Sequence, residues 1–350
     1  MNKAKKLFNT YRTLLRDHTT MTVFASIVVV AFLFISSSVA LTNLTEQKAS
    51  ARESLEAELV EIEQQTQLEI LAERIEEKKQ EFFSDVEIGG KAALVYDINT
   101  KEVLYERNAR EPFPLASIAK VMTVITAQDI LPKESAITID SRALATEGES
   151  GLLLDEVWNF KDLADLMLIV SSNDASTAIA NAAGERLLER KESASSEKTP
   201  YKLFINQMNA KALEIGMEHA SFENSSGLDL EYETLPSSVA SAYDVTTLLT
   251  YALLEYPSIL NHSRFGSYSV VSLNGRNFQA ENTNQLTDSI PGLLASKTGY
   301  TVQAGGNLAV VVDVGLMRPV VIVVLGSTRE GRFSDVEKLY DITKQYFRSL

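Results

Sequence analysis

The segment PFPLASIAK, residues 112–120, leads into a helical pattern at 118–129 and places a serine three positions before a lysine. On a helix this spacing puts Ser117 and Lys120 on one face, where the amine can reach the hydroxyl. A serine hydroxyl is a weak nucleophile until a base removes its proton. A lysine can be that base only if burial or a neighbouring charge lowers its pKa from about 10.4. The pair predicts a nucleophile and its base, although the same spacing recurs by chance at residues 195–198.

Two further polar motifs follow along the chain. Ser171-Ser172-Asn173 joins two helical patterns. Its hydroxyl and amide could relay a proton and bind a peptide carbonyl, or they could simply cap a helix. Lys297-Thr298-Gly299 comes later and is followed by Tyr300. On an edge strand its cation and hydroxyl would bind a carboxylate, and its glycine would let a ligand backbone approach. The alternative for this triplet is an ordinary exposed strand that ends in a turn.

The remaining patterns predict an α+β fold with one antiparallel sheet. Pairs of apolar runs near each end of residues 88–350 indicate two hairpins, at 92–96 with 103–106 and at 307–314 with 320–326. Helical patterns occupy 118–129, 160–171, 175–188, 201–215, 245–254 and 334–348, with Ser334 placed to cap the last one. The polar stretch KESASSEKTP, residues 191–200, indicates a surface loop. We expect both ends of this region to complete one sheet, covered by a helical subdomain.

The composition excludes several kinds of chemistry. The chain has 350 residues, a formal net charge of −14, no cysteine and three histidines. Without cysteine there are no disulfides, thiol nucleophiles or thiolate metal sites. The acidic charge argues against nucleic acid as a partner. His219 and His262 show neither metal-ligand spacing nor a catalytic signal beside them, and His18 precedes an apolar segment. We therefore expect no metal or other cofactor, and a catalytic base other than histidine.

The N-terminal region predicts a membrane segment. Residues 1–20 form a basic tail with five Lys or Arg against one acid, Asp17, whereas residues 21–41 carry no charge. As a helix the uncharged stretch would span about 31 Å, the thickness of a bilayer core. The basic flank predicts a cytoplasmic N-terminus and a catalytic region on the outer side of the cell membrane. The small residues at 36–40 also fit the end of a signal peptide, so an anchor and a cleaved signal both remain open.

Residues 42–87 predict a helical stalk. Between Thr45 and Glu81 there is no glycine or proline, and leucine and isoleucine recur at helical spacing with one slip of phase at 64–67. This pattern is typical of a long amphipathic helix or an imperfect coiled coil, through which two copies could associate. The alternative is a helix that lies against its own domain. Gly89-Gly90 then mark a boundary before a domain at 88–350.

The three motifs in this order resemble the serine β-lactamases and penicillin-binding proteins. The likeness is to the low-molecular-mass penicillin-binding proteins, the D-alanyl-D-alanine carboxypeptidases, and covers residues 88–350. Further segments share it: SSNDA at 171–175, Met208-Asn209, Gly216-Met217, Phe222-Glu223-Asn224, Gly227-Leu228, NTNQL at 282–286 and Ala304-Gly305. Together the segments are far more specific than any one of the motifs.

The resemblance implies a role for each site residue. Ser117 attacks the carbonyl between two D-alanines, Lys120 is its general base, and Ser171 passes a proton to the leaving amine. In the same way Asn173 holds the substrate, Lys297 and Thr298 of the Lys297-Thr298-Gly299 strand bind the terminal carboxylate, and Arg332 is a looser match to a further carboxylate-binding arginine. The backbone N–H groups of Ser117 and Tyr300 would form the oxyanion hole that acyl transfer requires.

The implied partners are a peptidoglycan stem peptide as substrate, β-lactams as inhibitors and the membrane at the N-terminal helix. A D,D-endopeptidase and a β-lactamase on the same fold are the alternatives, but the latter resembles the sequence less because no Glu-x-x-Leu-Asn segment lies between the last two motifs. An inactive anchored scaffold is a third possibility, which the intact motifs argue against. Two departures from the family remain: no additional C-terminal β-domain follows the last helix, and Ser296 replaces a frequent glycine.

Overall fold

The computed structural model describes residues 2–148, 150–190, 199–229, 238–315 and 317–350. The chain divides into two compact units, Met1–Glu76 and Glu77–Leu350. Residues 191–198 of the predicted surface loop at 191–200 lie outside the described residues, and with them the whole second Ser-x-x-Lys spacing at 195–198.

The first unit is a single helix. The helix α1 runs from Asn2 to Phe83 without a break, so the slip of phase at 64–67 does not interrupt it. Its apolar part is long enough to cross a membrane. The apolar side chains there are exposed, with Phe24 at 70% and Phe34 at 74%. Leu55 and Leu59 are also exposed.

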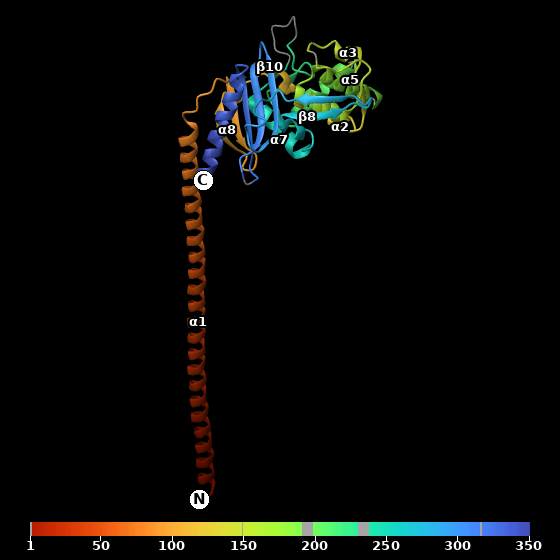
Figure 1. Ribbon diagram of the computed structural model, residues 1–350. Helices are drawn as coiled ribbons and strands as arrows, with labels where there is room; N and C mark the ends of the chain where they lie inside the picture. Colours follow the sequence, from red (N-terminus) through yellow and green to blue (C-terminus); the bar gives the residue numbers. More distant parts are fainter. Residues whose placement is uncertain (1, 149, 191–198, 230–237, 316) are drawn as a thin grey trace. The chain divides into compact units, whose positions relative to one another are not determined.

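The second unit is built on a five-stranded antiparallel sheet in the order β10-β11-β12-β1-β2 (Figure 1). The strands are β1 (Ala92–Asp97), β2 (Glu102–Arg107), β10 (Leu293–Thr301), β11 (Gly305–Asp313) and β12 (Pro319–Ser327). Both predicted hairpins are confirmed, as β1 with β2 and β11 with β12. They join because β1 also pairs with β12, in a register that sets Ala92 opposite Leu325. Both ends of the domain thus complete one sheet, as the sequence predicts.

The sheet is buried on both faces, because its strands are continuous runs of valine, isoleucine and leucine. Alternate residues of β1 point to opposite sides: Leu94 belongs to one hydrophobic core and Val95 to the other. The helix α7 (Ala242–Glu255) packs against β12 and β1 on the first side. On the second side the helix α8 (Gly331–Ser349) packs against β11 and β12.

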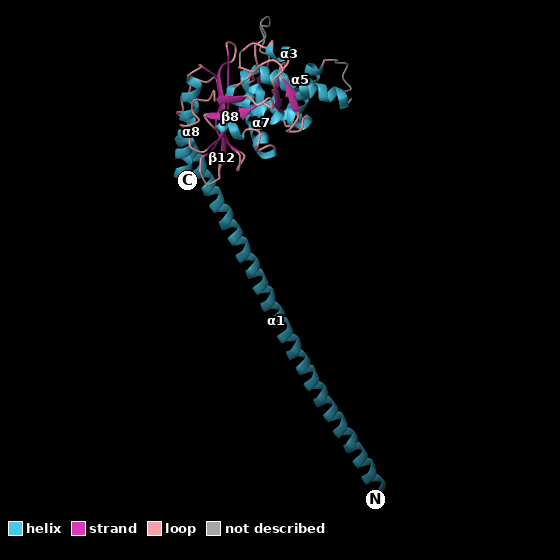
Figure 2. Ribbon diagram, turned by 45° about the vertical axis from the view of Figure 1, so that its right-hand side comes forward, coloured by secondary structure: helices cyan, strands magenta, loops and turns pink. Residues whose placement is uncertain are grey.

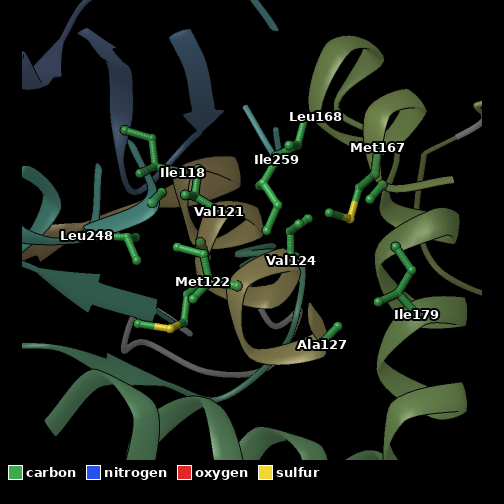
Figure 3. Packing of buried hydrophobic residues seen from close by; sticks show 14 of the residues in the cluster. Ile118, Val121, Met122, Val124, Ala127, Met167, Leu168, Ile179, Leu248 and Ile259 are labelled. Atoms are coloured by element: carbon green, nitrogen blue, oxygen red, sulfur yellow. The ribbon is translucent and has the colours of Figure 1, made fainter. Parts of the chain in front are cut away.

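A helical subdomain beside the sheet supplies the larger core (Figure 2). Its helices are α2 (Ala119–Ile130), α3 (Ser141–Leu144), α4 (Phe160–Val170), α5 (Asn173–Arg190) and α6 (Pro200–Glu214). Figure 3 shows Val121, Met122 and Val124 of α2 at the centre of this core, between Leu248 of α7 and Met167 of α4. The α2 helix that follows the first motif is therefore held from several sides.

Short elements complete the domain. They are the sheet of β3 (Phe113–Pro114), β7 (Ser238–Ala240) and β6 (Ser221–Phe222), the pair β4 (Ala136–Thr138) with β5 (Val157–Asn159), the pair β8 (Ser267–Val271) with β9 (Asn277–Glu281), and the 3-10 helices η1 (Ala116–Ile118) and η2 (Asn261–Arg264). The predicted helices are found close to their expected bounds. One detail was wrong: Ser334 does not cap the last helix, because α8 begins at Gly331 and the Ser334 hydroxyl donates back to the Gly331 carbonyl.

Candidate active site

The first motif lies at the junction of η1 and α2. Ala116 adopts a left-handed conformation with φ of 48°, which is unfavourable for a residue with a Cβ and is held by the surrounding chain. Ser117 sits in the single turn of η1, and α2 begins two residues later with Ala119. Ser117 is partly accessible, whereas Lys120 is completely buried. The arrangement exposes a hydroxyl and hides the amine beneath it.

Lys120 contacts three oxygen atoms. Its Nζ lies 2.8 Å from Ser117 Oγ, 2.7 Å from Asn173 Oδ1 and 2.8 Å from the Ser226 carbonyl oxygen. Burial lowers the pKa of Lys120 well below its ordinary value, and the charge of Lys297 lowers it further. The neutral amine has two N–H hydrogens and one lone pair. The Asn173 and Ser226 oxygens can only accept, so they take the hydrogens and leave the lone pair facing the Ser117 hydroxyl.

Asn173 is oriented by the loop before β5. Its Nδ2 donates to the Glu147 carbonyl over 2.7 Å. Because that carbonyl can only accept, the amide must turn its Oδ1 toward Lys120. Asn173 begins α5 two residues after Ser171, which ends α4 in a left-handed conformation with φ of 62°. The tight reversal between the two helices brings both side chains of the second motif to the first.

Lys297 on β10 joins the third motif to the second. Its Nζ donates to Ser171 Oγ and to the Thr298 carbonyl, each over 2.9 Å. The side chain is 1% exposed. Burial and then the nearby charge of Arg332 lower the pKa of Lys297 to about 7. Two buried amines therefore lie in one site, each touching a different serine, and the charge of Lys297 favours the neutral form of Lys120.

The rest of the β10 motif packs against the nucleophile segment. A Cβ atom at Gly299 would lie 2.6 Å from the Leu115 carbonyl oxygen and 3.2 Å from the Ser117 nitrogen. The expectation that this glycine admits a ligand backbone was incomplete, because its first effect is to let the chain's own backbone approach. Tyr300 is exposed at the end of the strand. The Thr298 hydroxyl lies 2.6 Å from that of Thr283.

Ser296 has a packing role in place of the glycine that is frequent in the family. Its backbone N–H donates to Ser263 Oγ over 3.0 Å, and its hydroxyl donates to the Ser263 carbonyl over 2.8 Å. These bonds tie the strand to η2. Of the two bonds, the one from the hydroxyl is a contact that a glycine at this position could not make.

Arg332 lies beneath the same strand. Its Nη1 donates to the Gly299 carbonyl over 2.7 Å, and the side chain is only 7% exposed. Its Nε has no hydrogen-bond partner among the described residues. Burial, and then the charge of Arg329, lower its pKa. Arg332 is therefore close to the third motif, with a donor left over.

The structure adds residues that the motifs did not reveal. The Ser226 carbonyl, which binds Lys120, is held by a turn in which Asn224 Oδ1 accepts from the N–H groups of Ser226 and Gly227. Asn307 on β11 donates to the carbonyls of Pro114 and Leu115 over 2.8 and 3.1 Å, and fixes the segment before Ser117. For the turn that holds the Ser226 carbonyl, the resemblance at residues 222–228 was the available signal in the sequence. Nothing comparable pointed to Asn307.

The part of the chain that the structure describes contains no group of three or more His, Cys, Asp or Glu residues that could hold a metal ion. The chemistry available from this arrangement is acid–base and nucleophilic. A serine hydroxyl faces a buried amine of lowered pKa, a second serine faces a second amine, and a strand edge offers a cation and a hydroxyl to an anionic group.

Comparisons with known proteins give the same picture. Residues 76–329 match the family described as D-alanyl-D-alanine carboxypeptidase. The chain is 32% identical to D-alanyl-D-alanine carboxypeptidase DacF of Bacillus subtilis over 259 residues, which are 72% of this chain and 61% of that protein. It is 30% identical to the D-alanyl-D-alanine endopeptidase of Escherichia coli K12, over 73% of this chain and 77% of that protein.

Solved structures show the same fold. Penicillin-Binding Protein D2 from Listeria monocytogenes, in its cefotaxime-bound form, superposes with a TM-score of 0.60 at 27% identity, covering 74% of this chain and 98% of that one. The Streptomyces K15 DD-transpeptidase superposes with a TM-score of 0.65 at 22% identity, covering 76% and 99%.

Proposed function

Because the chain belongs to the D-alanyl-D-alanine carboxypeptidase family, we propose that it is a serine D,D-carboxypeptidase that removes the terminal D-alanine from peptidoglycan stem peptides. One observation carries the proposal. The buried Lys120 amine has two obligate acceptors, Asn173 Oδ1 and the Ser226 carbonyl, and its third contact is Ser117 Oγ. Such an amine is a base already directed at its serine.

The acylation step follows from this contact. Lys120 takes the proton of Ser117, and Oγ forms a bond to the carbonyl carbon between the two D-alanines. The carbonyl oxygen gains the negative charge, and the N–H groups of Ser117 and Tyr300 stabilise it. When the C–N bond breaks, Ser171 relays the proton held by Lys120 to the leaving nitrogen. The free D-alanine departs and the rest of the peptide stays on Ser117 as an ester.

The third motif binds the end of the substrate. A protonated Lys297 and the Thr298 hydroxyl donate to the terminal carboxylate, and the positive charge of the nearby Arg332 favours the same anion. Asn173 holds the peptide on the other side of the serine. Water then attacks the ester, and Ser117 recovers its proton as the shortened peptide leaves. Penicillins, which resemble the substrate, would stop at the ester stage.

A D,D-endopeptidase is the second candidate. The E. coli relative named D-alanyl-D-alanine endopeptidase is matched over 77% of its length, a larger share than the 61% of the Bacillus carboxypeptidase. The same catalytic residues would serve, with a cross-linked peptide in place of the terminal D-alanine. A β-lactamase would need fast release of the penicillin ester, for which the sequence offers no Glu-x-x-Leu-Asn segment.

The N-terminal helix supports a membrane-anchored enzyme. Residues 1–20 would remain in the cytoplasm, 21–41 would span the membrane, and 42–87 would form a stalk for the domain at 88–350. The exposed leucines of the stalk are available to pack against the stalk of a second copy. On this topology the enzyme works on the cell-wall side of the membrane.

The first test is covalent labelling of the full chain in neutral detergent micelles with a penicillin, read by intact mass. We expect a stable adduct of one penicillin that is absent from the Ser117→Ala variant. A folded chain that takes up no label would contradict the proposal, and rapid turnover of the label would favour a β-lactamase. Incubation with a stem pentapeptide and with a cross-linked dimer then separates carboxypeptidase from endopeptidase by the product released.

A further inference from the structure

A hollow lies at the opposite end of the sheet from the catalytic end of β10. Its volume is about 830 Å³. It is formed where the start of β10, the turn between β11 and β12 and the turn between β1 and β2 meet the last turns of α8. The strand β10 reaches the catalytic site at its other end, with Lys297-Thr298-Gly299. No residue of the three catalytic motifs lines the hollow.

Three cations converge on this hollow. Arg318 comes from the turn before β12, and Lys344 and Arg348 come from successive turns of α8. The Arg318 guanidinium lies 4.0 Å from the centre of the Phe347 ring, and its Nε donates to Asp97 over 2.6 Å. These two contacts hold Arg318 beside α8. The hollow thus receives positive charge from two separate elements of the fold.

The cations are only partly compensated. Lys344 donates to the Tyr340 hydroxyl over 3.1 Å, which leaves two of its three N–H donors available. Arg348 has no hydrogen bond or ion pair with any residue that the structure describes. Lys344 and Arg348 are four apart on one helix, where like charges repel. The one carboxylate in the lining, Asp313, already accepts from the N–H groups of Gly315 and Arg318.

The end of α8 accounts for part of this charge, because cations near the C-terminus of a helix are favourable. Arg318 is paired with Asp97, so the charges that no ion pair among the described residues balances are those of Lys344 and Arg348. In a chain of net charge −14, these two cations beside one concavity are a local excess of positive charge. An anion bound between them would remove their mutual repulsion.

The size and lining of the hollow indicate which class of anion it would bind. The volume is in the range of small-molecule sites. Phosphate oxygens accept readily from lysine and arginine, and the rings of Tyr340 and Phe347 offer a surface to the carbon atoms attached to the phosphate. We propose that this hollow binds a phosphate-bearing group, either the headgroup of a phospholipid or a soluble phosphate ester.

The surroundings connect the site to the end of α1. Phe82 and Phe83, which belong to the same compact unit as α8, pack on Tyr346 with ring centres 6.1 and 5.7 Å apart. Tyr346 in turn contacts Phe347 with ring centres 5.0 Å apart. The binding site therefore lies in the part of the domain where the chain enters from the N-terminal helix.

Binding of two phosphate probes tests the proposal. The full chain in neutral detergent micelles is titrated with sn-glycerol 3-phosphate and with monomeric dihexanoyl phosphatidylglycerol, and affinity is measured by calorimetry. The Lys344→Gln/Arg348→Gln variant should bind about a hundredfold more weakly, since each of its two lost charged hydrogen bonds is worth about tenfold in affinity. The matched control is Lys133→Gln/Arg186→Gln, which removes the same charge from surface positions outside the hollow and should keep its affinity within about twofold.

The outcomes separate clearly. Tighter binding of the lipid than of glycerol phosphate identifies a headgroup site, and equal binding identifies a site for soluble phosphate esters. Absence of saturable binding of either probe overturns the proposal, as does an equal loss in the control variant. Circular dichroism of every variant shows that the domain is folded. Because neither readout uses Ser117, the result is independent of the proposed peptidase function.

Discussion

A Cβ atom at Gly227 would lie only 1.9 Å from the carbonyl oxygen of Ala116. Both residues have left-handed backbones, with φ of 77° at Gly227 and 48° at Ala116. Ala116 precedes the nucleophile Ser117, and Gly227 follows Ser226, whose carbonyl binds the Lys120 amine. The close approach of the two backbones therefore sets the position of the base relative to the serine.

Gly227→Ala should disrupt this contact. We expect a loss of about 2–4 kcal/mol in the free energy of unfolding and slower penicillin acylation, because backbone must move on one side or the other. Urea unfolding and the acylation rate measure the two effects. Gly216→Ala is the matched control: its φ is 86°, but nothing lies within 4 Å of the added Cβ. Equal losses in both variants would mean that the left-handed backbone, and not the contact, accounts for the effect.

Lys120→Met should remove the base while preserving most of the buried volume. The acylation rate should fall by about 10²–10⁴-fold, the usual contribution of a general base. The folded chain should survive, because methionine has no charge to desolvate. Stopped-flow acylation and circular dichroism check the two parts. Lys202→Met, in which another lysine is replaced on α6, serves as the control. Acylation of the Lys120 variant at the wild-type rate would exclude Lys120 as the base.

The pH dependence of kcat/KM should report the ionisation of Lys297. Lys297 has a pKa of about 7, so in the free enzyme it carries its charge only below that pH. Binding of the substrate carboxylate should therefore weaken as pH rises above about 7, which gives an alkaline limb. In Lys297→Arg the guanidinium stays charged, and the limb should move to higher pH. An alkaline limb at the same pH in both proteins would assign it to a different group.

The free energy of unfolding should rise with pH, whereas binding of the substrate carboxylate should weaken. Folding lowers the pKa of Lys297 from 10.5 to about 7, so between these values the unfolded chain binds more protons than the folded one. The free energy of unfolding then rises with pH across this window, by at most about 1.4 kcal/mol per pH unit for each such group. Lys120, whose pKa is also lowered, contributes in the same direction.

Lys297→Met isolates this contribution. The variant should be more stable than the wild type near pH 7, where the buried amine is unfavourable, and the difference should shrink toward pH 10. Urea unfolding of both proteins at several pH values measures it. A difference that does not change with pH would show that Lys297 titrates normally in the folded chain.

Asn307→Ala should destabilise the segment that precedes Ser117. The completely buried Asn307 amide donates to the carbonyls of Pro114 and Leu115, and its Oδ1 accepts from the Gly326 N–H. Removal leaves these groups unpaired, at a cost of about 1–3 kcal/mol for each. Asn307→Asp keeps the acceptor but loses the donor, so it tests whether the two carbonyls need the bond. Unfolding and acylation rates near wild type in both variants would contradict this role.

Much of the fold could be predicted from the sequence because it depends on local pattern. The valine-rich runs determined both hairpins, and helical spacing located the helices of the subdomain. The pairing of β1 with β12 was expected only in outline, because no local signal sets the register of strands from opposite ends of a domain. Ser334 was wrongly taken as a cap, since a serine near a helix start can equally donate to the preceding turn.

The candidate site was predictable where side chains carry the chemistry. Ser117, Lys120, Asn173 and Lys297 were predicted as motif residues, and the structure brings them together. The partner that orients the Lys120 amine is the Ser226 carbonyl, a backbone atom that every residue possesses, so no residue type reveals it. Gly299 was assigned to ligand approach because the sequence cannot show that Leu115 lies against it. Whether these residues perform the proposed roles is tested by the variants above.

The position of β1 in the sheet has a consequence for the newly made chain. β1 lies between β2, its immediate successor in sequence, and β12, one of the last elements to be synthesised. The hairpin of β1 and β2 can form early, but its open edge must wait for residues 319–327 before it is paired. Pairing of strands so distant in sequence is slow, and an unpaired apolar edge invites aggregation during the delay. Premature termination shortly before β12 would therefore yield an aggregation-prone fragment rather than a smaller folded enzyme.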